Sequence, residues 1–335
     1  MLHSIRTKGQ FMAAELQESA SVFCTAAMQD ISNLQHILGT EKPRAIYTIA
    51  RGSSDAAANI LSYEFMRELG IPVTSLPPSV YSVGKGVSVG GALGIVISQS
   101  GASEDLVRAA RGMTTNGALV AAITNVANSL VERAANVTLS IKAGEEKAVP
   151  ATKTVIGSVG AGLALLTALK PDYRARLLRS VESFAKLEGL PKSAHADLKA
   201  ALLRARNVYV VGRDTGFGAA HELALKIKET CAIHAEAYSA SEVLHGPLQL
   251  ATNSLTVFVL DTGAPGTSQS IENAVERFSK AGAEVHRVST EQDFGPAAAA
   301  AAILRLFYPV ILDVALELGL DPDAPATLSK VTVTT

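Results

Sequence analysis

The sequence predicts an α/β protein of two tandem, doubly wound parallel sheets in three-layer αβα packing, preceded by N-terminal helices. Runs of apolar, strand-like residues alternate with segments of helical spacing along most of the chain. The strand runs are apolar throughout, which is typical of parallel sheets covered by helices on both faces. A similar order of elements recurs after about 160–165 residues, which indicates a duplicated α/β unit.

The first half contains five expected strands and their crossover helices. Helices over 10–20 and 22–38 come first, and residues 41–44 break their pattern. Strands are expected at residues 45–50, 71–76, 93–98, 118–124 and 137–141, and helices at residues 55–69, 103–115, 151–169 and 173–188.

The second half repeats this plan, with strands expected at residues 207–213, 255–260 and 284–289. A helical linker over 173–205 breaks at 189–191. After residue 319 the tail is extended, because its prolines lack amide donors and bias their neighbours away from helix. The resulting domains are N-terminal helices (1–40), a first domain (41–190) and a second domain with the C-terminal tail (191–335).

The composition supports a large folded core and argues against a polyanionic partner. The chain has 335 residues, of which 48% are hydrophobic and 18% charged, so intrinsic disorder is excluded. Its 30 basic and 31 acidic side chains give a net charge of −1. This balance offers no positive field for a nucleic acid or an anionic membrane, and we expect neither as a partner.

Cysteine usage and hydropathy favour the cytoplasm. Cys24 and Cys231 are the only cysteines and form no CxxC motif, and the seven histidines show no ligand spacing. We therefore expect neither a disulfide framework nor a metal site. The N-terminus lacks the apolar segment of a signal peptide, and the longest uncharged run, residues 154–169, is shorter than the ~20 residues that span a bilayer.

Residues 98–103, Ser-Gln-Ser-Gly-Ala-Ser, join a predicted strand to a predicted helix and form the first candidate binding site. In open parallel sheets, ligands bind outside the carboxyl ends of the strands, where the strand order switches. The hydroxyls, the amide side chain and the unpaired N–H groups at the helix start suit a phosphate monoester. The alternative is that Ser100 or Ser103 merely caps the helix. Glu104 and Asp105 in the first turn favour that alternative, since they would repel a phosphate that they faced.

Gly52, Ser53 and Ser54 follow the first predicted strand and add hydroxyls to the same sheet edge. Serines are common after strands, so this loop alone indicates little. Two hydroxyl-rich strand ends in one sheet favour a phosphate site over simple helix capping. The matching turn in the second half, residues 213–215, offers one hydroxyl and an acid, and we do not interpret it as a second phosphate site.

The densest group of polar side chains lies between Glu222 and His245. Glu222, Lys226 and Glu229 are spaced at i, i+4 and i+7 and therefore share one helical face. That spacing alone is typical of a solvated salt-bridge face. His245 precedes a Gly-Pro pair, which holds it in a turn. A carboxylate base, a lysine and a turn-held histidine are the groups needed to open a sugar ring and move a proton between adjacent carbons.

Two further lysines stand apart from this group. Lys153 begins a predicted helix, where a positive side chain is unfavourable next to the positive end of the helix dipole. This unusual position favours contact with an anionic ligand. Lys330 lies on the extended tail, where a lysine is usually solvated.

The serine loop at 98–103, the duplicated α/β plan and the run from Glu222 to Pro247 resemble the sugar isomerase (SIS) family. Within that family, the sequence is similar to the isomerase half of the glutamine–fructose-6-phosphate aminotransferases, which synthesise glucosamine 6-phosphate. The resemblance covers nearly the whole chain, and the run from Glu222 to Pro247 carries it most specifically.

The resemblance implies a role for each candidate residue and implies no cofactor. Glu229 would transfer the proton between C1 and C2 of the sugar, and His245, supplied by the neighbouring subunit of a homodimer, would assist ring opening. Lys330 matches the lysine that forms a Schiff base with the C2 carbonyl. Glu222 and Lys226 match a supporting pair beside the base. The sugar phosphate would be bound by Ser54, Ser98, Gln99, Ser100 and Ser103. We add Ser53, Val149 and Lys153 as further candidates for binding the substrate.

Departures from the family pattern concern the substrate and the nitrogen source. Leu244 stands where the synthases have a lysine, Ser103 where they have a threonine, and residues 150–151 where they have a pair with a substrate-contacting serine. Leu2 follows Met1, where the synthases have the cysteine nucleophile of their glutaminase domain. We therefore expect the proton-transfer chemistry without glutamine-dependent synthesis.

Together these features predict a cytoplasmic, homodimeric enzyme with a shared active site that converts glucosamine 6-phosphate to fructose 6-phosphate and ammonia. One alternative is an aldose–ketose phosphosugar isomerase, which needs the same base and phosphate loop but no nitrogen chemistry. A second is a deglycase that acts on a sugar-phosphate adduct of an amino acid. A third is a non-catalytic sugar-phosphate sensor, which would keep the serine loop and could lose Glu229 or His245.

Overall fold

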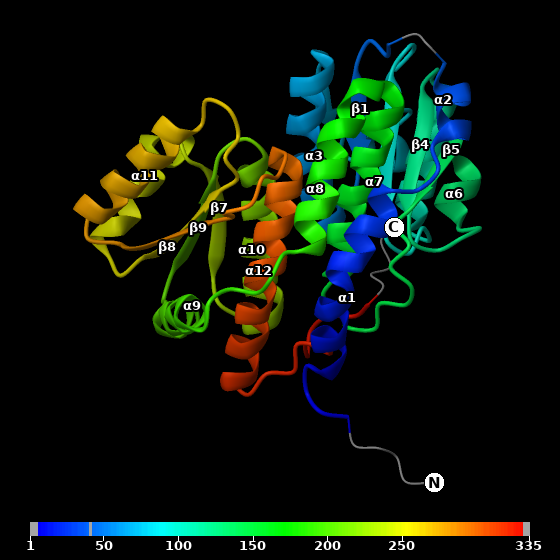
Figure 1. The fold of residues 1–335 in the computed structure, drawn as a ribbon. Coiled ribbons are helices and arrows are strands. Elements are labelled where there is room, and N and C mark those ends of the chain that lie inside the picture. Colours follow the sequence, from blue (N-terminus) through cyan, green and yellow to red (C-terminus); the bar gives the residue numbers. More distant parts are fainter. Residues whose placement is uncertain (1–5, 40–41, 331–335) are drawn as a thin grey trace, which may run out of the picture.

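The protein folds into two α/β halves, each built around a parallel sheet, in a computed structural model that describes residues 6–39 and 42–330 (Figure 1). The first sheet has the strand order β2-β1-β3-β4-β5 and the second the order β7-β6-β8-β9. The expected fold class is thereby confirmed. The strands are β1 (Ile46–Ile49), β2 (Val73–Ser75), β3 (Leu93–Ser98), β4 (Leu119–Thr124), β5 (Val137–Ser140), β6 (Val208–Gly212), β7 (Ala235–Ser239), β8 (Thr256–Asp261) and β9 (Glu284–Ser289).

Helices cover both faces of each sheet (Figure 1). In the first half they are α1 (Gln10–Ala27), α2 (Ser32–Leu38), α3 (Ser53–Leu69), α4 (Ser79–Ser82), α5 (Glu104–Thr115), α6 (Leu130–Ala134), α7 (Lys153–Leu169) and α8 (Arg174–Ala185). In the second half they are α9 (Lys192–Arg204), α10 (Thr215–Cys231), α11 (Ser268–Lys280) and α12 (Pro296–Glu317). Short 3₁₀ turns are η1 (Pro171–Tyr173), η2 (Glu242–His245) and η3 (Pro247–Thr252).

Several elements differ from expectation, among them helices α4, α6 and α11, which no predicted helix covers. The break expected near residue 21 is absent, because α1 runs on to Ala27 and keeps Val22 and Phe23 buried. The hydroxyls of Ser19 and Ser21 bond carbonyls one turn back, so these serines sit inside the helix. Strand β7 was not predicted, since its sequence alternates small and polar residues that carry no apolar run. Helix α12 was not predicted either, although it is the longest helix of the described chain.

Helices α3 and α10 pack against each other where the two halves meet, and they bring the two sheets together. Their approach requires glycine at 218, because a Cβ there would lie 2.6 Å from the backbone nitrogen of Ile60. Helix α12 lies along α10 and joins the same core. It is the one helix of the described chain that is long and apolar enough to cross a membrane, and 78% of that segment is buried inside the protein, as a core helix requires.

Candidate active site

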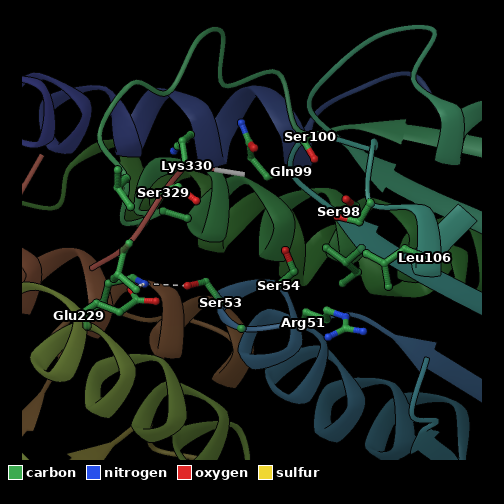
Figure 2. A pocket seen from close by; sticks show the side chains of 17 residues that line it. Arg51, Ser53, Ser54, Ser98, Gln99, Ser100, Leu106, Glu229, Ser329 and Lys330 are labelled. Atoms are coloured by element: carbon green, nitrogen blue, oxygen red, sulfur yellow. Dashed lines mark hydrogen bonds and ion pairs between the residues drawn. The ribbon is translucent and has the colours of Figure 1, made fainter. Parts of the chain in front are cut away.

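A cavity of about 340 Å³ opens at the carboxyl ends of β1 and β3 (Figure 2). These two strands are neighbours, but the chain leaves β1 for β2 on one side and reaches β3 on the other, so the strand order switches here. Segments far apart in sequence meet at the cavity. Its walls are Arg51, Gly52, Ser53, Ser54, Ile97, Ser98, Gln99, Ser100, Ser103, Leu106, Val149, Ala151, Lys226, Glu229, Leu328, Ser329 and Lys330.

The loop between β3 and α5 forms a hydroxyl-lined wall of the cavity. Gly101 has φ +60°, and a Cβ there would lie 2.2 Å from the Ser129 hydroxyl, so only glycine fits. The Ser98 hydroxyl accepts from the Gly101 N–H at 3.1 Å and fixes the loop. Ser103 occupies the N-cap position of α5 but makes no capping bond with its side chain. Its hydroxyl therefore stays at the cavity wall beside the unpaired N–H groups of the helix.

The turn between β1 and α3 brings the second set of hydroxyls. Gly52 has φ 54° and ψ −128°, a conformation that glycine tolerates best. The turn places Ser53 and Ser54 at the start of α3, facing the serine loop across the cavity (Figure 2). The Ser53 hydroxyl accepts from Lys226 Nζ at 2.7 Å, which connects the first half to α10 of the second.

Helix α10 contributes an acid–lysine–acid series that is buried rather than solvated. Lys226 Nζ lies 2.5 Å from Glu229 Oε2 and 3.4 Å from Glu222 Oε1. The Lys226 and Glu222 side chains are 1% and 0% exposed, whereas that of Glu229 is 25% exposed and lines the cavity. The ordinary explanation of a solvated salt-bridge face is therefore wrong. Glu229 is the carboxylate of this series that lines the cavity.

Burial controls the protonation of the inner part of this series. Burial raises the pKa of Glu222 to about 7, against the opposing effect of the Lys226 charge. Glu222 accepts one hydrogen bond from the Tyr308 hydroxyl at 3.0 Å, and its Oε2 is buried without a partner in the described chain. Burial also opposes the charge on Lys226, but Glu222 and Glu229 outweigh it and raise the Lys226 pKa. Lys226 is thus a fixed cation beside Glu229.

The C-terminal tail returns to the cavity and closes its remaining side. Lys330 Nζ donates to Glu146 Oε2 at 3.1 Å and to the Ala148 carbonyl at 2.5 Å. The Glu146 side chain is fully buried and accepts from the N–H groups of Thr152 and Thr154. Because these donors satisfy Glu146 inside the fold, it acts as a rigid anchor for the Lys330 ammonium at the cavity wall.

The structure brings most of the candidate residues to this one cavity. Glu222 lies behind Lys226 rather than in the wall. His245 is exposed in η2 and does not line the cavity. The candidates that line it are Ser53, Ser54, Ser98, Gln99, Ser100, Ser103, Val149, Lys226, Glu229 and Lys330.

Lys153 is not in the cavity. Its side chain is 3% exposed at the start of α7, and its Nζ pairs with Glu18 Oε2 of α1 at 2.6 Å. This ion pair between two packed helices gives the lysine a structural reason to stand near the positive end of the α7 dipole. The helix-dipole argument took no account of an acid from α1, because Glu18 is 135 residues away in sequence.

Two functional candidates escaped the sequence reasoning. Arg51 lines the cavity, and its Nε donates to Asp105 Oδ2 at 2.5 Å. This pairing also answers the objection that Asp105 would repel a phosphate, because its charge is offset. Glu146 was missed because nothing in the sequence separates it from exposed Glu145. The position of Arg51 directly before the Gly-Ser-Ser turn was a usable signal.

No metal site is evident at the cavity. Among residues 6–39 and 42–330, no cluster of three or more histidine, cysteine or acidic side chains could hold an ion. The hydroxyls and amides of the cavity can bind an oxyanion, and the Lys226 ammonium is a fixed cation beside the Glu229 carboxylate.

Comparisons with known proteins agree with this geometry. The SIS domain family model matches residues 41–168 and 201–310. A glutamine–fructose-6-phosphate aminotransferase (isomerizing) from Pyrobaculum aerophilum is 30% identical over 352 residues, covering 97% of this chain and 58% of its own length. The chain spans 56–58% of the length of the first three curated relatives.

Solved structures give the same result. A candidate phosphosugar isomerase from Silicibacter pomeroyi is 31% identical, with a TM-score of 0.84 and coverage of 93% of this chain and 99% of that one. Glucosamine-6-phosphate deaminase from Thermotoga maritima is 20% identical with a TM-score of 0.74, covers 97% of this chain and 100% of its own, and shows the shared fold alone. Two SIS segments, the paired parallel sheets and relatives along nearly the whole sequence lead to one conclusion: the chain belongs to the SIS domain family.

Proposed function

We propose that the protein is an isomerising deaminase that converts glucosamine 6-phosphate to fructose 6-phosphate and ammonia. The observation that carries this proposal is the meeting of a hydroxyl-lined oxyanion cradle with Glu229 and Lys226 in one cavity of about 340 Å³. The cradle consists of Ser54, Ser98, Ser100 and Ser103 with the start of α5. A sugar phosphate held there by its phosphate extends its other carbons toward α10.

The proposed chemistry needs a base that removes one proton and returns it to the neighbouring carbon. Once the ring is open, Glu229 takes the proton from C2 of the amino aldehyde while the C1 carbonyl oxygen takes up a proton, which leaves an enolamine with a hydroxyl at C1. Return of the first proton to C1, with loss of one proton from the nitrogen, gives an imine at C2. Addition of water and loss of ammonia then yield the ketone of fructose 6-phosphate, so that atoms and charge balance.

Lys226 supports this step electrostatically. Its ammonium lies 2.5 Å from the Glu229 carboxylate and orients that carboxylate toward the substrate. Lys330 is placed at the cavity wall, where its nitrogen reaches the C2 region either as a Schiff-base nucleophile or as a fixed cation while water attacks directly.

Ring opening is assigned to His245 of a second subunit. In its own subunit His245 is exposed and outside the cavity, so the proposal requires a homodimer in which η2 of one copy approaches the cavity of the other. The proposed enzyme acts in the cytoplasm and uses no cofactor. In water, with no ammonia donor supplied, release of ammonia is the favoured direction.

A direct assay tests the proposal. The full chain is incubated with glucosamine 6-phosphate, and ammonia and fructose 6-phosphate are measured in parallel. Equal amounts of both products support the deaminase. A second reaction, with fructose 6-phosphate and glutamine, tests for synthesis; glucosamine 6-phosphate formed there would contradict the assignment to deamination.

A plain aldose–ketose phosphosugar isomerase is the second candidate. It is favoured by the 31% identity to the candidate phosphosugar isomerase of S. pomeroyi over 93% of this chain. It needs the same cradle and the same base, with an oxygen in place of the nitrogen at C2. Interconversion of an unaminated aldose phosphate and ketose phosphate, without ammonia release from glucosamine 6-phosphate, identifies this activity. Ligand binding with neither reaction would indicate a sugar-phosphate sensor.

A further inference from the structure

Arg51 brings a positive charge to the cavity wall next to the serine hydroxyls, in addition to the Lys226 and Lys330 ammonium groups that also line the cavity. It lies two residues beyond β1 and directly before the Gly-Ser-Ser turn (Figure 2). Its side chain is 47% exposed, while that of its partner Asp105 is 1% exposed. The ion pair engages Nε of Arg51 at 2.5 Å. A guanidinium carries four further N–H donors on its two Nη atoms, and these are the groups that can contact a ligand in the cavity.

The charges of this pair have opposite consequences for an anion in the cradle. Asp105 stands in the first turn of α5, immediately after the loop that ends at Ser103. Without its partner, the Asp105 carboxylate would repel a phosphate bound at that helix start; the Arg51 guanidinium offsets that charge and attracts the phosphate. Serine hydroxyls and backbone N–H groups bind any tetrahedral oxyanion. Unlike these neutral donors, the Arg51 guanidinium binds more strongly to a ligand that carries a second negative charge.

We propose that Arg51 is a specificity-determining residue that makes the cavity select a dianionic phosphate monoester over a singly charged or neutral sugar. This inference rests on the proposed function, because it takes the hydroxyl cradle as the phosphate site. It goes further by assigning the discrimination between anions to one residue whose charge the sequence reasoning had left out.

The test compares two ligands of one shape and different charge. Glucitol 6-phosphate, which has no carbonyl to react, and glucitol 6-sulfate are titrated by calorimetry into the full-length protein at pH 8, where the phosphate is a dianion. The wild type is expected to bind the phosphate at least ~10-fold more tightly than the sulfate. Arg51→Gln should weaken phosphate binding about 10- to 100-fold and sulfate binding less than about threefold.

Asp105→Asn is the matched control, since it removes the negative charge of the same ion pair. If Arg51 recognises charge, the Asp105→Asn variant binds the phosphate as tightly as the wild type or more tightly. If the pair merely braces the loop, both variants weaken both ligands alike, and the proposal is wrong. Melting temperatures show whether either variant has lost its fold.

The outcomes also separate this inference from the proposed function. A wild type that binds neither ligand overturns the phosphate cradle itself, and the role of Arg51 with it. A wild type that binds the phosphate tightly while Arg51→Gln retains that affinity overturns the assignment of Arg51 alone.

Discussion

The turns after β1 and β6 have the same backbone conformation, with Gly52 at φ 54° and ψ −128° and Asp214 at φ 57° and ψ −132°. Each turn leads into a 17-residue helix, α3 or α10, and these helices pack together. The side chains at the two sheet edges differ. After β1, serines line a cavity; after β6, Asp214 accepts from the Thr215 N–H at 2.7 Å and pairs with Arg67.

At the edge of the second sheet, after β6, other parts of the chain pack against the strand ends. The Thr215 hydroxyl lies 2.9 Å from the Thr262 hydroxyl and donates to the Pro296 carbonyl at 3.0 Å. The next N–H of α12, that of Ala297, donates to Glu64 at 3.3 Å. The start of α12 therefore occupies the place that corresponds to the cavity of the first half. One of the two sheet edges borders a cavity, and the other is filled by a structural contact.

The ion pairs on the packed helices α3 and α10 differ in the same way, one bordering the cavity and the other enclosed. On α10, Lys226 and Glu229 at i, i+3 reach Ser53 at the start of α3. On α3, Glu64 and Arg67 at i, i+3 reach Asp214, which caps α10. The first pair borders a cavity and the second is enclosed. A strand-end hydroxyl or acid is thus accessible to a ligand where no other part of the chain packs against it.

The largest effect is expected at Glu229, the acid that lines the cavity at the edge of the first sheet. Glu229→Gln should lower turnover about 10²- to 10⁴-fold, because an amide accepts no proton, while binding of a sugar phosphate persists. Steady-state kinetics and calorimetry measure the two quantities. Glu236→Gln is the control, since Glu236 accepts from Tyr238 on β7 and lies outside the cavity. Full activity of the Glu229→Gln variant would remove Glu229 from the mechanism.

The two buried glutamates of the helix pair should respond differently to neutralisation. Glu64 accepts from Arg67, from the Tyr173 hydroxyl at 2.9 Å and from Ala297, so Glu64→Gln should lower the free energy of unfolding by about 2–4 kcal/mol at pH 8. Glu222 has a buried oxygen without a partner in the described chain, and Glu222→Gln should cost at most about 1 kcal/mol at pH 8. Equal losses in chemical denaturation would contradict the comparison.

The pH dependence of stability tests whether burial shifts the pKa of Glu222. The folded-state pKa of Glu222, about 7, exceeds its unfolded value, so the folded protein holds this proton more tightly. Wild-type stability relative to Glu222→Gln should therefore fall as pH rises from about 4.5 to 7. Denaturation at a series of pH values measures this difference. A difference that stays constant over the range would show that Glu222 ionises normally.

Gly52→Asp places an acid in the turn after β1, at the position where the turn after β6 has Asp214. The new carboxylate would lie at the cavity wall, so the KM for a sugar phosphate should rise about 10-fold or more by like-charge repulsion. A Cβ at 52 meets only Leu225, at 3.9 Å, but the positive φ costs about 1–3 kcal/mol of stability. Gly52→Asn carries the same strain without the charge. If both variants raise KM equally, strain rather than charge is responsible.

The smallest effect is expected at Asp214, in the turn after β6. Asp214→Asn keeps an oxygen to accept from Thr215 but removes the ion pair with Arg67. We expect a loss of about 1 kcal/mol in the free energy of unfolding and no more than a twofold change in kcat/KM. Thermal melts and kinetics on the same preparation measure both. A large loss of activity would show that this edge also takes part in catalysis.

Patterns local to the sequence determined the elements and the polar groups of the site. Apolar runs located eight of the nine strands of the described chain, and the hydroxyl-rich segments 52–54 and 98–103 lie together at the sheet edge where their strands predicted them. The spacing of Glu222, Lys226 and Glu229 placed them on one face of α10. These features are local because backbone hydrogen bonding and side-chain periodicity act within a few residues.

Only the tertiary structure decided which of these groups are available to a ligand. It buried Lys226, paired Lys153 with Glu18, returned Lys330 to Glu146 from 184 residues away, and placed Arg51 opposite Asp105. It also closed the second sheet edge with α12. The exposure and charge of a side chain depend on whatever packs against it, and for these residues the packing partners come from distant segments that no local pattern specifies.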